Sequence, residues 1–397
     1  MNKVVLGNVC EKIGSGATPR GGSDVYLSQG EIALIRSQNV YNDGFKKDGL
    51  AYITEVHAEE LSNVTVEPND VLLNITGDSV ARCCQVPDDI LPARVNQHVA
   101  IIRPQKDKLD ARYLRYYLVD PIMQDYMLML AGGGATRNAL TKGMIGSFEI
   151  PAPSVPEQRA IAGILGALDD KIELNRHMNR TLESIARAVF RQWFVESEDV
   201  GDWADKPLYE YAEYINGAAY RDFDFSPDNS GLPIIKIAEI KNGITNQTKY
   251  TNKQMDEKYR IINGDILFAW SGSPDTSIDT FIWVNGEGWL NQHIFKVIPP
   301  DPDKKWFTYL LLKHFKEIFI EIARDKQTTG LGHVTVKDLS RLVFTYPPDK
   351  VVAKFSEIVD PMMERIFTNE KESRTLASLR DSLLPKLMRG EVRVRGT

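Results

Sequence analysis

Three residues in the second half of the chain have the types and spacing of a metal-dependent nuclease site. Asp228 follows a proline, and Glu239 and Lys241 stand two positions apart further along. In a PD-(D/E)xK site, two such carboxylates bind a divalent cation that activates water. Short patterns of this kind arise often by chance, and a related segment earlier in the chain has Asn39 and Tyr41 at the matching positions. A nuclease is therefore an alternative interpretation and not the leading one.

Other catalytic signatures are missing from the sequence. Tyr346-Pro-Pro-Asp349 lacks both ends of the Asp/Asn-Pro-Pro-aromatic motif of an N6-adenine methyltransferase. There is no GxxxxGK[ST] phosphate-binding loop, which excludes an ATP site of that type. Cys83 and Cys84 are adjacent and Cys10 is isolated, so the cysteines favour neither a zinc pair nor a disulfide framework. We predict a non-enzyme that binds no metal or cofactor directly.

Two matching triplets, Asn96-Gln-His98 and Asn291-Gln-His293, carry side chains that can read bases. Asn and Gln form paired hydrogen bonds with adenine. Domains that read different sequences should differ at their base contacts, whereas these triplets are identical. We therefore favour a scaffold role, in which each triplet holds a loop in place, over base reading.

Positive, aromatic and polar residues in loops bordered by glycine are better candidates for contacts with DNA. Arginine and lysine bind phosphate and guanine, and an aromatic ring can lie against a groove. The candidates are Thr18, Arg20, Arg36, Arg137 and Asn138 in the first half, and Tyr220, Arg221, Lys236, Trp270, Ser271, Thr329 and His333 in the second. For each of them, an ordinary solvated surface residue is the alternative.

The candidate residues lie in two copies of one sequence pattern. Residues 6–194 and 208–388 contain four similar blocks in the same order. The matched blocks are Ile32–Val40 with Leu232–Ile240, Pro68–Gly77 with Asn263–Gly272, Val95–Val99 with Leu290–Ile294, and Phe148–Pro153 with Val343–Pro348. A repeat of this length is far beyond the period of solenoids or propellers, so it predicts two whole domains.

Within each copy, short apolar runs alternate with turn signals. The runs are partly β-branched and are bounded by Gly, Pro, Asn or Asp, as is typical of strands. We expect strands at Ile32–Ile35, Val71–Ile75, Val99–Ile102, Pro233–Ile237, Ile266–Trp270 and Ile294–Ile298, and helices at Ala111–Leu118 and Trp306–Lys313. Glycine-rich turns follow at 132–136 and 328–332. Each copy therefore predicts a mixed α+β domain with a strongly curved sheet.

A long helix is expected after each domain. Ser154 and Glu157 form an S-x-x-E capping box, and the uninterrupted stretch of roughly 38 residues that follows would make a helix about 57 Å long. Apolar residues recur three and four positions apart, which is the spacing of a coiled-coil stripe. The first stripe is Ile161, Ile164, Leu168, Ile172, Leu182, Ile185, Val189 and Trp193, and the second is Phe355, Val359, Met362, Ile366, Leu376, Leu379, Leu383 and Leu387.

Each stripe has a polar gap at mid-length. Asn175 and Asn179 interrupt the first stripe, and Glu370 and Ser373 interrupt the second. If the helices pair antiparallel, the gaps coincide in a polar layer that fixes the register. The predicted fold class is α+β, with two tandem mixed α/β domains joined by two long antiparallel coiled-coil helices and related by a pseudo-two-fold axis. The alternative is that each helix packs only on its own domain.

The composition is that of an ordinary globular chain. Of 397 residues, 43% are hydrophobic and 26% are charged. No apolar run approaches the roughly 20 residues of a membrane span, and the N-terminus lacks a secretory signal, so we expect a cytoplasmic protein. The net charge of −6 argues against nucleic-acid binding by the chain as a whole. It does not exclude a local basic face, which is what phosphate contact requires.

The layout resembles the specificity subunit of type I restriction–modification enzymes. The resemblance rests on Ser15-Gly-Ala-Thr-Pro19, Asp70-Val-Leu-Leu followed by Gly77, the glycine turn before Leu140-Thr-Lys142, and Ile150–Gln158 at the start of the first long helix. No single motif is specific, but their order, their repetition and the two long helices together are. The resemblance divides the chain into a first target recognition domain (1–153), a long spacer helix (154–195), a linker (196–207), a second target recognition domain (208–348) and a second long spacer helix (349–391).

The resemblance implies a non-catalytic subunit that gives a restriction–modification complex its DNA sequence specificity. Each recognition domain would read one half of a bipartite duplex DNA site, and the paired helices would set the spacer. The helices would also dock two methyltransferase subunits, which flip an adenine and methylate its N6 with S-adenosylmethionine. Restriction subunits that use ATP and Mg²⁺ would join through the methyltransferases. The candidate docking residues are Glu157, Gln158, Ile161, Leu168, Ile172, Phe355, Ile366, Leu376 and Leu383.

The second copy departs from the first in two places. Its helix opens with Asp349-Lys-Val-Val352, without a Glu-Gln pair, and it has Asn216-Gly-Ala-Ala-Tyr220 where the first copy has Gly14–Pro19. The two docking surfaces would therefore be unequal, and unlike loops on like scaffolds imply half-sites of different sequence. A coiled-coil interaction scaffold unrelated to DNA is, beside the nuclease, the other alternative.

Overall fold

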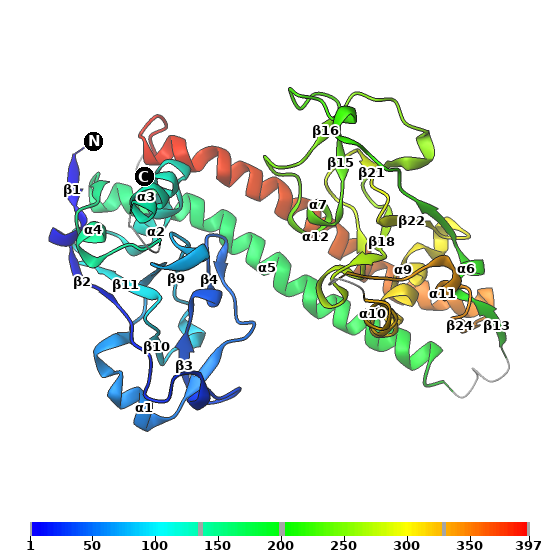
Figure 1. The fold of residues 1–397 in the computed structure, drawn as a ribbon, viewed down its shortest axis with the longest axis horizontal. Helices are drawn as coiled ribbons and strands as arrows, with labels where there is room; N and C mark the ends of the chain where they lie inside the picture. The colour runs from blue at the N-terminus through cyan, green and yellow to red at the C-terminus, as the bar shows by residue number, and fades with distance from the viewer. Residues whose placement is uncertain (1, 134–137, 198–202, 328–330, 395–397) are drawn as a thin grey trace. The chain divides into compact units, whose positions relative to one another are not determined.

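The computed structural model describes residues 2–133, 138–197, 203–327 and 331–394, and the chain forms two compact units (Figure 1). Unit 1 comprises Met1–Asp170 with Ala377–Thr397, and unit 2 comprises Lys171–Leu376. The two long helices, α5 (Val155–Phe194) and α12 (Asp349–Met388), contribute a segment to each unit. None of the described helices is long and apolar enough to cross a membrane.

Unit 1 carries two four-stranded sheets, in the orders β2-β11-β8-β9 and β6-β3-β10-β7. Its strands are β1 (Lys3–Val5), β2 (Cys10–Ser15), β3 (Ile32–Ile35), β4 (Val40–Tyr41), β5 (Gly44–Phe45), β6 (Ala51–Ile53), β7 (Thr65–Val66), β8 (Val71–Asn74), β9 (Cys83–Gln85), β10 (Ala93–Val95), β11 (Val99–Pro104) and β12 (Glu149–Pro151). Its shorter helices are α1 (Glu55–Glu60), α2 (Ala111–Val119), α3 (Pro121–Gly132) and α4 (Lys142–Gly146).

Unit 2 repeats this plan, with sheets in the orders β14-β22-β18-β20 and β16-β15-β21-β17. Its strands are β13 (Ala204–Pro207), β14 (Glu213–Asn216), β15 (Leu232–Ile235), β16 (Tyr250–Thr251), β17 (Arg260–Ile261), β18 (Ile266–Ala269), β19 (Ser271–Gly272), β20 (Asp279–Ile282), β21 (Gly288–Leu290), β22 (Ile294–Ile298), β23 (Gly332–His333) and β24 (Val343–Tyr346). Its shorter helices are α6 (Leu208–Tyr211), α7 (Ile237–Asn242), α8 (Pro274–Ser277), α9 (Lys305–His314), α10 (Lys316–Asp325) and α11 (Val336–Leu339).

The duplicated α+β plan predicted from the sequence is confirmed at the level of strand order. In both units the second sheet contains one parallel pair, β3 with β10 and β15 with β21, and all its other pairs are antiparallel. The expectation of one strongly curved sheet per domain is wrong, because each unit has two four-stranded sheets. The central strands are buried on both faces, which explains their unbroken apolar sequences.

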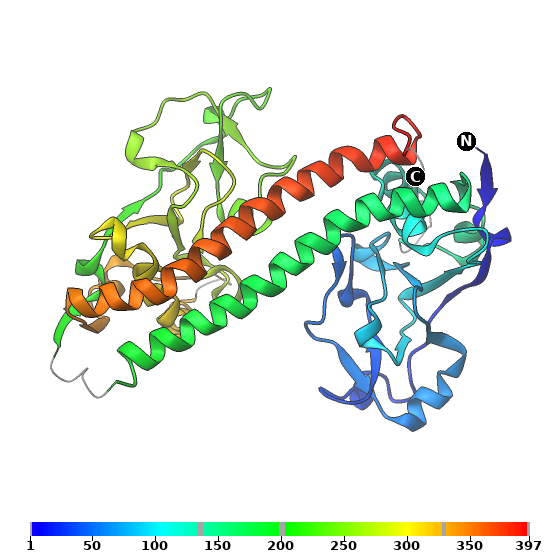
Figure 2. The ribbon, with the colours of Figure 1, turned by 180° about the vertical axis from the view of Figure 1, so that it is seen from behind.

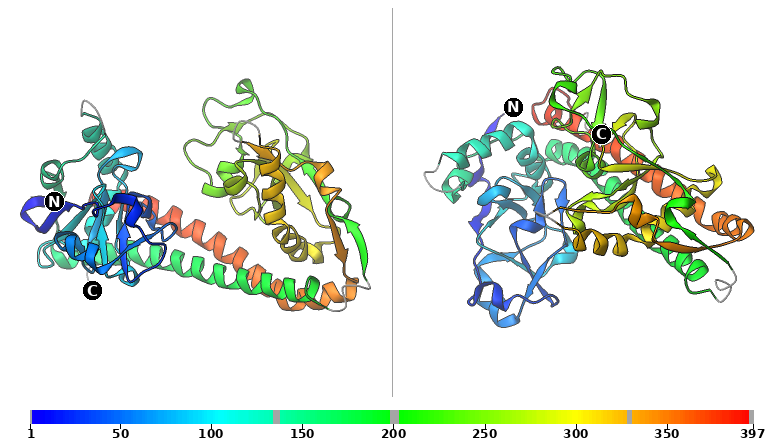
Figure 3. Two further views of the ribbon diagram at one scale, coloured as in Figure 1. Left: turned by 60° about the horizontal axis from the view of Figure 1, so that its bottom comes forward. Right: turned by 45° about the vertical axis from the view of Figure 1, so that its right-hand side comes forward.

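Each unit has a core that joins its sheet to the long helices. In unit 1, Leu165 of α5 and Leu387 of α12 lie in one cluster with α2 and the first sheet. In unit 2, Phe190 of α5 and Phe355 of α12 lie in a cluster with α9, α10 and the sheet that contains β18 and β22. Figure 3 shows the ribbon of this unit with both long helices running past its sheet. The helices are therefore an integral part of both cores.

Within each unit, the segments of α5 and α12 run side by side in opposite directions (Figure 2). In unit 2, Asn175 donates hydrogen bonds to Ser373 (3.2 Å), and Asn179 donates one to Glu370 (2.8 Å). The polar layer predicted from the coincidence of the two gaps is therefore confirmed, and separate packing of the helices is wrong. Asn369, which is fully buried, donates to the side chain of Asn179 at 2.8 Å and completes the layer.

The buried stripe of α5 differs from the predicted stripe at two positions. Ile164 and Ile185 are about two-fifths exposed, whereas the neighbouring Leu165 and Ala186 are buried. Leu165 lies seven residues before Ile172 and Ala186 lies two such intervals after it, and a seven-residue repeat keeps one face of a helix against its partner. Both positions of each adjacent pair are apolar, so apolarity alone did not identify the inward one.

Candidate nucleic-acid interface

The triplets Asn96–His98 and Asn291–His293 turn the chain from one sheet into the other. In unit 1 the triplet joins β10 to β11, and in unit 2 it joins β21 to β22. The Asn96 amide donates to the carbonyl of Ile35 (3.0 Å), and the Asn291 amide donates to that of Ile235 (3.1 Å). Both asparagine side chains are buried. This geometry supports the scaffold role for the asparagines.

A glycine packs against each of these corners. A Cβ on Gly16 would lie 1.9 Å from the carbonyl oxygen of Val95, and one on Gly217 would lie 2.1 Å from that of Asn291. The glycines are required because the two backbones are in direct contact. The residues that follow them, including Thr18, Arg20 and Arg221, are thereby held near the corner of their unit, and Thr18 is hydrogen-bonded to Gln97.

A cation lies over an aromatic ring at the end of a strand in both units. The guanidinium of Arg36 lies 5.4 Å from the ring centre of Tyr26, and the ammonium of Lys236 lies 5.5 Å from that of Phe225. Such contacts fix the direction of a long side chain while leaving its charge near water. Sequence reasoning identified the cations and missed the two rings. The sequence could have indicated the two rings, because an aromatic residue precedes the cation in each copy of the repeat.

The nuclease-like trio in unit 2 has structural roles. Glu239 is buried, and its carboxylate accepts hydrogen bonds from the amide of Lys236 (3.0 Å) and the hydroxyl of Thr248 (3.2 Å). Asp228 is exposed and accepts from the amide of Ser230 at 3.1 Å. No cluster of three metal-ligating side chains occurs among the described residues. The Glu239 carboxylate, which a nuclease would use to bind a cation, instead caps the start of α7.

Trp270 is fixed by the fold of unit 2. Its indole nitrogen donates to the side chain of Asn216 (2.9 Å), and its ring centre lies 5.7 Å from that of Phe295. Its amide donates to the carbonyl of His293, in the corner triplet, at 3.3 Å. The half-buried ring is part of the support of the loop and does not project freely from it.

The segments after β8 and β18 carry the remaining candidates. In unit 2, Ser271 of β19 pairs with His333 of β23. In unit 1, Thr76 forms the corresponding bridge with Ala139, beside the exposed Asn138. The two units therefore present different side chains, histidine and alanine, at the same place in the fold.

The other candidates divide into exposed, buried and undescribed residues. Arg20 and Arg221 are exposed. The hydroxyl of Tyr220 is buried, finds no hydrogen-bond partner within the described ranges, and has its pKa raised by burial. Arg137 and Thr329 lie outside the described residues.

Several proposed docking residues are buried inside the chain. Gln158 is fully buried, accepts from the amide of Asp110 (2.8 Å) and donates to the carbonyl of Pro153 (2.9 Å). Ile161, Ile172 and Phe355 are also buried, with at most a twentieth of their surface exposed. The interpretation of these four residues as partner contacts is corrected, because the intramolecular core already covers them. Glu157, Leu168, Ile366, Leu376 and Leu383 are half-buried.

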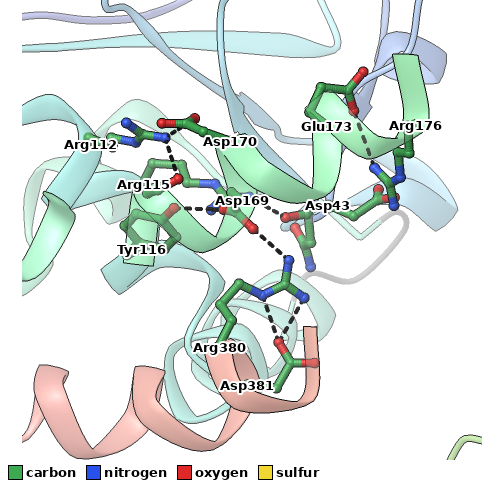
Figure 4. Close-up of polar contacts among 12 residues, drawn as sticks. Asp43, Arg112, Arg115, Tyr116, Asp169, Asp170, Glu173, Arg176, Arg380 and Asp381 are labelled. Atoms are coloured by element: carbon green, nitrogen blue, oxygen red, sulfur yellow. Dashed lines mark hydrogen bonds and ion pairs between the residues drawn. The ribbon is translucent and has the colours of Figure 1, made fainter. Parts of the chain in front are cut away.

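An ion-pair network in unit 1, which we name the Asp169 network, joins α2 to both long helices (Figure 4). Asp169 accepts from Arg115 (2.9 Å), from the hydroxyl of Tyr116 (2.6 Å) and from Arg380 (2.7 Å). Burial opposes ionisation of Asp169, but these three partners outweigh it and hold its pKa below the ordinary value. The members are far apart in sequence, so no local pattern indicates the network.

Aromatic side chains join the second unit to the same helices. The ring centre of Phe194 lies 5.0 Å from that of Phe307 and 4.8 Å from that of Phe355, and Phe190 lies 5.5 Å from Phe307. The two units therefore share one strand order, and each adds a distinct contact to its apolar core with the helices: the Asp169 network in unit 1 and the aromatic rings in unit 2.

Comparisons with known proteins place these features in context. The family model for the type I restriction modification DNA specificity domain matches residues 1–184 and 201–376. The MjaIX specificity subunit of Methanocaldococcus jannaschii is 27% identical over 329 residues, covering 76% of this chain and 74% of the relative. The EcoKI specificity subunit of Escherichia coli is 23% identical over 398 residues, covering 92% and 84%.

A solved structure shows the same fold. The S subunit of a type I restriction–modification system from M. genitalium superposes with a TM-score of 0.61 at 15% identity, covering 97% of this chain and 95% of that one. At this level of identity the likeness concerns the fold alone.

Proposed function

Because the chain belongs to the family of type I restriction–modification DNA specificity proteins, we propose that each of its units reads one half of a bipartite DNA site. Members of this family are non-catalytic specificity subunits that function in complexes with methyltransferase and restriction subunits and DNA. The chain is such a subunit.

One observation carries the proposal: the two units share a scaffold and differ at its surface. The strand orders, the corner triplets and the glycines behind them are common to both. In contrast, Asn138 has Gly332 as its counterpart, and Ala139 has His333. Contacts that are shared suit the DNA backbone, whereas those that differ suit base edges, which carry the sequence information.

The candidate contacts sort by this criterion. Arg20 with Arg221, and Arg36 with Lys236, carry the same charge at matched places, and we assign them to phosphates. Asn138 and His333 lie in matched segments with different side chains, and we assign them to bases. The remaining described candidates support these loops and are not assigned to DNA contacts. They are Thr18, Trp270 and Ser271, through the contacts described above, and Tyr220, whose hydroxyl is buried.

The long helices set the spacer and dock the methyltransferase subunits on their outward faces. Glu157, Leu168, Ile366, Leu376 and Leu383 keep part of their surface accessible for such contacts. The docked methyltransferases would supply S-adenosylmethionine for methylation of a flipped adenine at N6, and the restriction subunits would supply ATP and Mg²⁺. Cytoplasmic location follows from this function, because the substrate is cellular DNA.

Adenine methylation by the reconstituted complex tests the proposal. The chain is co-expressed with its methyltransferase in a host without adenine methylation, and the genome is then mapped for N6-methyladenine. We expect one bipartite motif with a fixed gap. His333→Ala should relax the base preference in one half only, whereas Arg221→Ala should reduce methylation at all sites alike. A continuous motif, or an effect of His333→Ala in both halves, contradicts the proposal.

A further inference from the structure

A groove of about 430 Å³ lies between α5 and α9 in unit 2. Arg180, Arg187 and Arg191 of α5 line it, together with His314 at the end of α9. Phe190 also lines it, with its ring centre 5.8 Å from that of His314. The groove lies on the helix and not on the loops assigned above to the recognition of bases.

The arginines of this groove are available to an anion. Arg187 makes no hydrogen bond or ion pair within the described part of the chain. Arg180 pairs with Glu173 at 3.3 Å and Arg191 pairs with Glu196 at 3.1 Å, and more than half of each of these two arginine side chains is exposed. Exposed pairs of this kind contribute little to stability, so a ligand phosphate can replace the carboxylates.

The other ionisable groups at the groove do not oppose an anion. Burial, together with the charge of Arg187, lowers the pKa of His314, so at neutral pH the ring is uncharged and can donate one hydrogen bond. Glu183 is the one acidic lining residue, and its carboxylate lies 3.8 Å from the ammonium of Lys313. The residues that line the groove therefore carry three arginines against one glutamate, in a chain whose net charge is −6.

The spacing of the arginines fits a chain of charges. They stand at intervals of seven and four residues, which place them on one face of α5 with axial separations of about 10 and 6 Å. A single carboxylate or phosphate would meet one or two of them. A DNA strand carries a phosphate about every 3.4 Å along the axis, so it can meet all three.

We propose that this groove binds the sugar–phosphate backbone of duplex DNA, outside the bases that the two units read. The inference rests on the proposed function for its choice of polyanion, since an acidic protein segment would offer similar charges. The site is one-sided: aligning Asn369 with Asn175 places Arg374, Asp381 and Pro385 at the matching positions of α12. The α12 helix therefore lacks the row of three arginines, and the groove, which would contact only phosphates, adds affinity without adding sequence preference.

The test uses the full chain assembled with its methyltransferase and a random-sequence DNA duplex. The dissociation constant is measured over a series of salt concentrations for the wild type and for the triple variant R180Q/R187Q/R191Q. Each lost phosphate contact should lower the slope of log affinity against log salt by about 0.9, so the triple variant should lose up to about 2.7. The Arg365→Gln variant, which removes an exposed guanidinium from α12 in the same unit, should leave the slope unchanged.

Further measurements make the result decisive. Thermal unfolding of the triple variant checks that the fold is intact, which we expect because the three arginines are at the surface. An unchanged slope overturns the proposal. Weaker assembly with the methyltransferase in the absence of DNA, together with an unchanged slope, also overturns it and assigns the groove to an acidic partner segment. A reduced slope in a complex whose wild type selects no bipartite sequence supports the groove and rejects the proposed function.

Discussion

Asp360 illustrates how the surroundings of a single residue change its chemistry. It lies on α12 in unit 2, and one of its carboxylate oxygens is buried without a hydrogen-bond partner among the described residues. Burial, with the nearby charges of Glu364 and Asp303, raises its pKa to about 6, against the opposing effects of Ser356 and Lys305. This carboxylate is therefore protonated in the folded chain at a pH where most others are ionised.

Replacing Asp360 should stabilise the protein in a pH-dependent manner. The folded carboxyl keeps its proton up to about pH 6, and the unfolded one loses it near pH 4, so wild-type stability falls as pH rises through that window. Asp360→Asn removes this loss. Urea unfolding should show a gain of roughly 1 kcal/mol at pH 7.5, after allowance for solvent screening, and little gain at pH 4.

The control for this substitution is Glu357→Gln, which neutralises an exposed carboxylate on the same helix. It should change stability little at either pH. Equal stabilisation by Asp360→Asn at both values would contradict the assignment, since it would show that ionisation of Asp360 is not responsible.

At the scale of elements, each unit adds a different kind of contact to the apolar core that joins it to the long helices. In unit 1 the Asp169 network supplies charge-assisted hydrogen bonds, whereas in unit 2 Phe190, Phe194, Phe307 and Phe355 supply tilted and edge-on rings. Ion pairs depend on the ionisation of their members, and apolar contacts do not. Acid should therefore weaken the contribution of the Asp169 network and leave the contribution of the rings unchanged.

The Asp169→Asn substitution tests the contribution of the network. It leaves Arg115 and Arg380 without their carboxylate, and Arg115 is only 8% exposed. We expect a loss of about 2–3 kcal/mol in the stability of unit 1 at neutral pH, measured by hydrogen exchange of α2 amides. Because the folded pKa is depressed, the wild type gains this stability above the unfolded value near 4 and loses it below. The stability of unit 1 in the wild type and in the variant should therefore become equal in acid.

The neighbouring residue provides a matched control. Asp170 pairs with Arg112, but two-thirds of its side chain is exposed. Asp170→Asn should therefore cost less than about 1 kcal/mol. If the Asp169 and Asp170 variants were equally stable, the network would have no structural role.

At the scale of the whole molecule, α5 and α12 are continuous through both units, and the polar layer fixes their register. A bipartite site read by two units on such helices should have a gap that depends on helix length. The gap should be independent of the loops, because those belong to the separate sheets of each unit.

Lengthening both helices together should widen the gap. Seven residues inserted after Leu182 in α5 and after Ile366 in α12 add two turns, about 10 Å, which corresponds to about three base pairs. The methylation map should keep the same half-sites with a gap wider by that amount. The same insertion in α5 alone misaligns the paired stripes and should abolish methylation. An altered half-site with an unchanged gap would refute the spacer role.

The sequence by itself determined the repeat, the strand positions and the pairing of the long helices. These are encoded locally: the period of apolar residues specifies strand or helix, and the mid-length gaps at Asn175 and Glu370 specify which segments of the helices meet. The corner triplets could be assigned to the scaffold because they are identical in the two copies of the repeat, and the sequence alone allows the copies to be compared.

Only the tertiary structure decided which side chains are exposed and which distant residues meet. Leu165 is buried and Ile164 is not, because only one face of α5 packs against the partner helix and the core. Asp169 meets Arg115 and Arg380 across intervals of the chain that no local pattern spans. The spacing of Arg180, Arg187 and Arg191 was readable as one helix face, but their groove exists only where α9 packs beside α5. Burial and long-range contact are properties of the folded chain, and the sequence constrains them without specifying them.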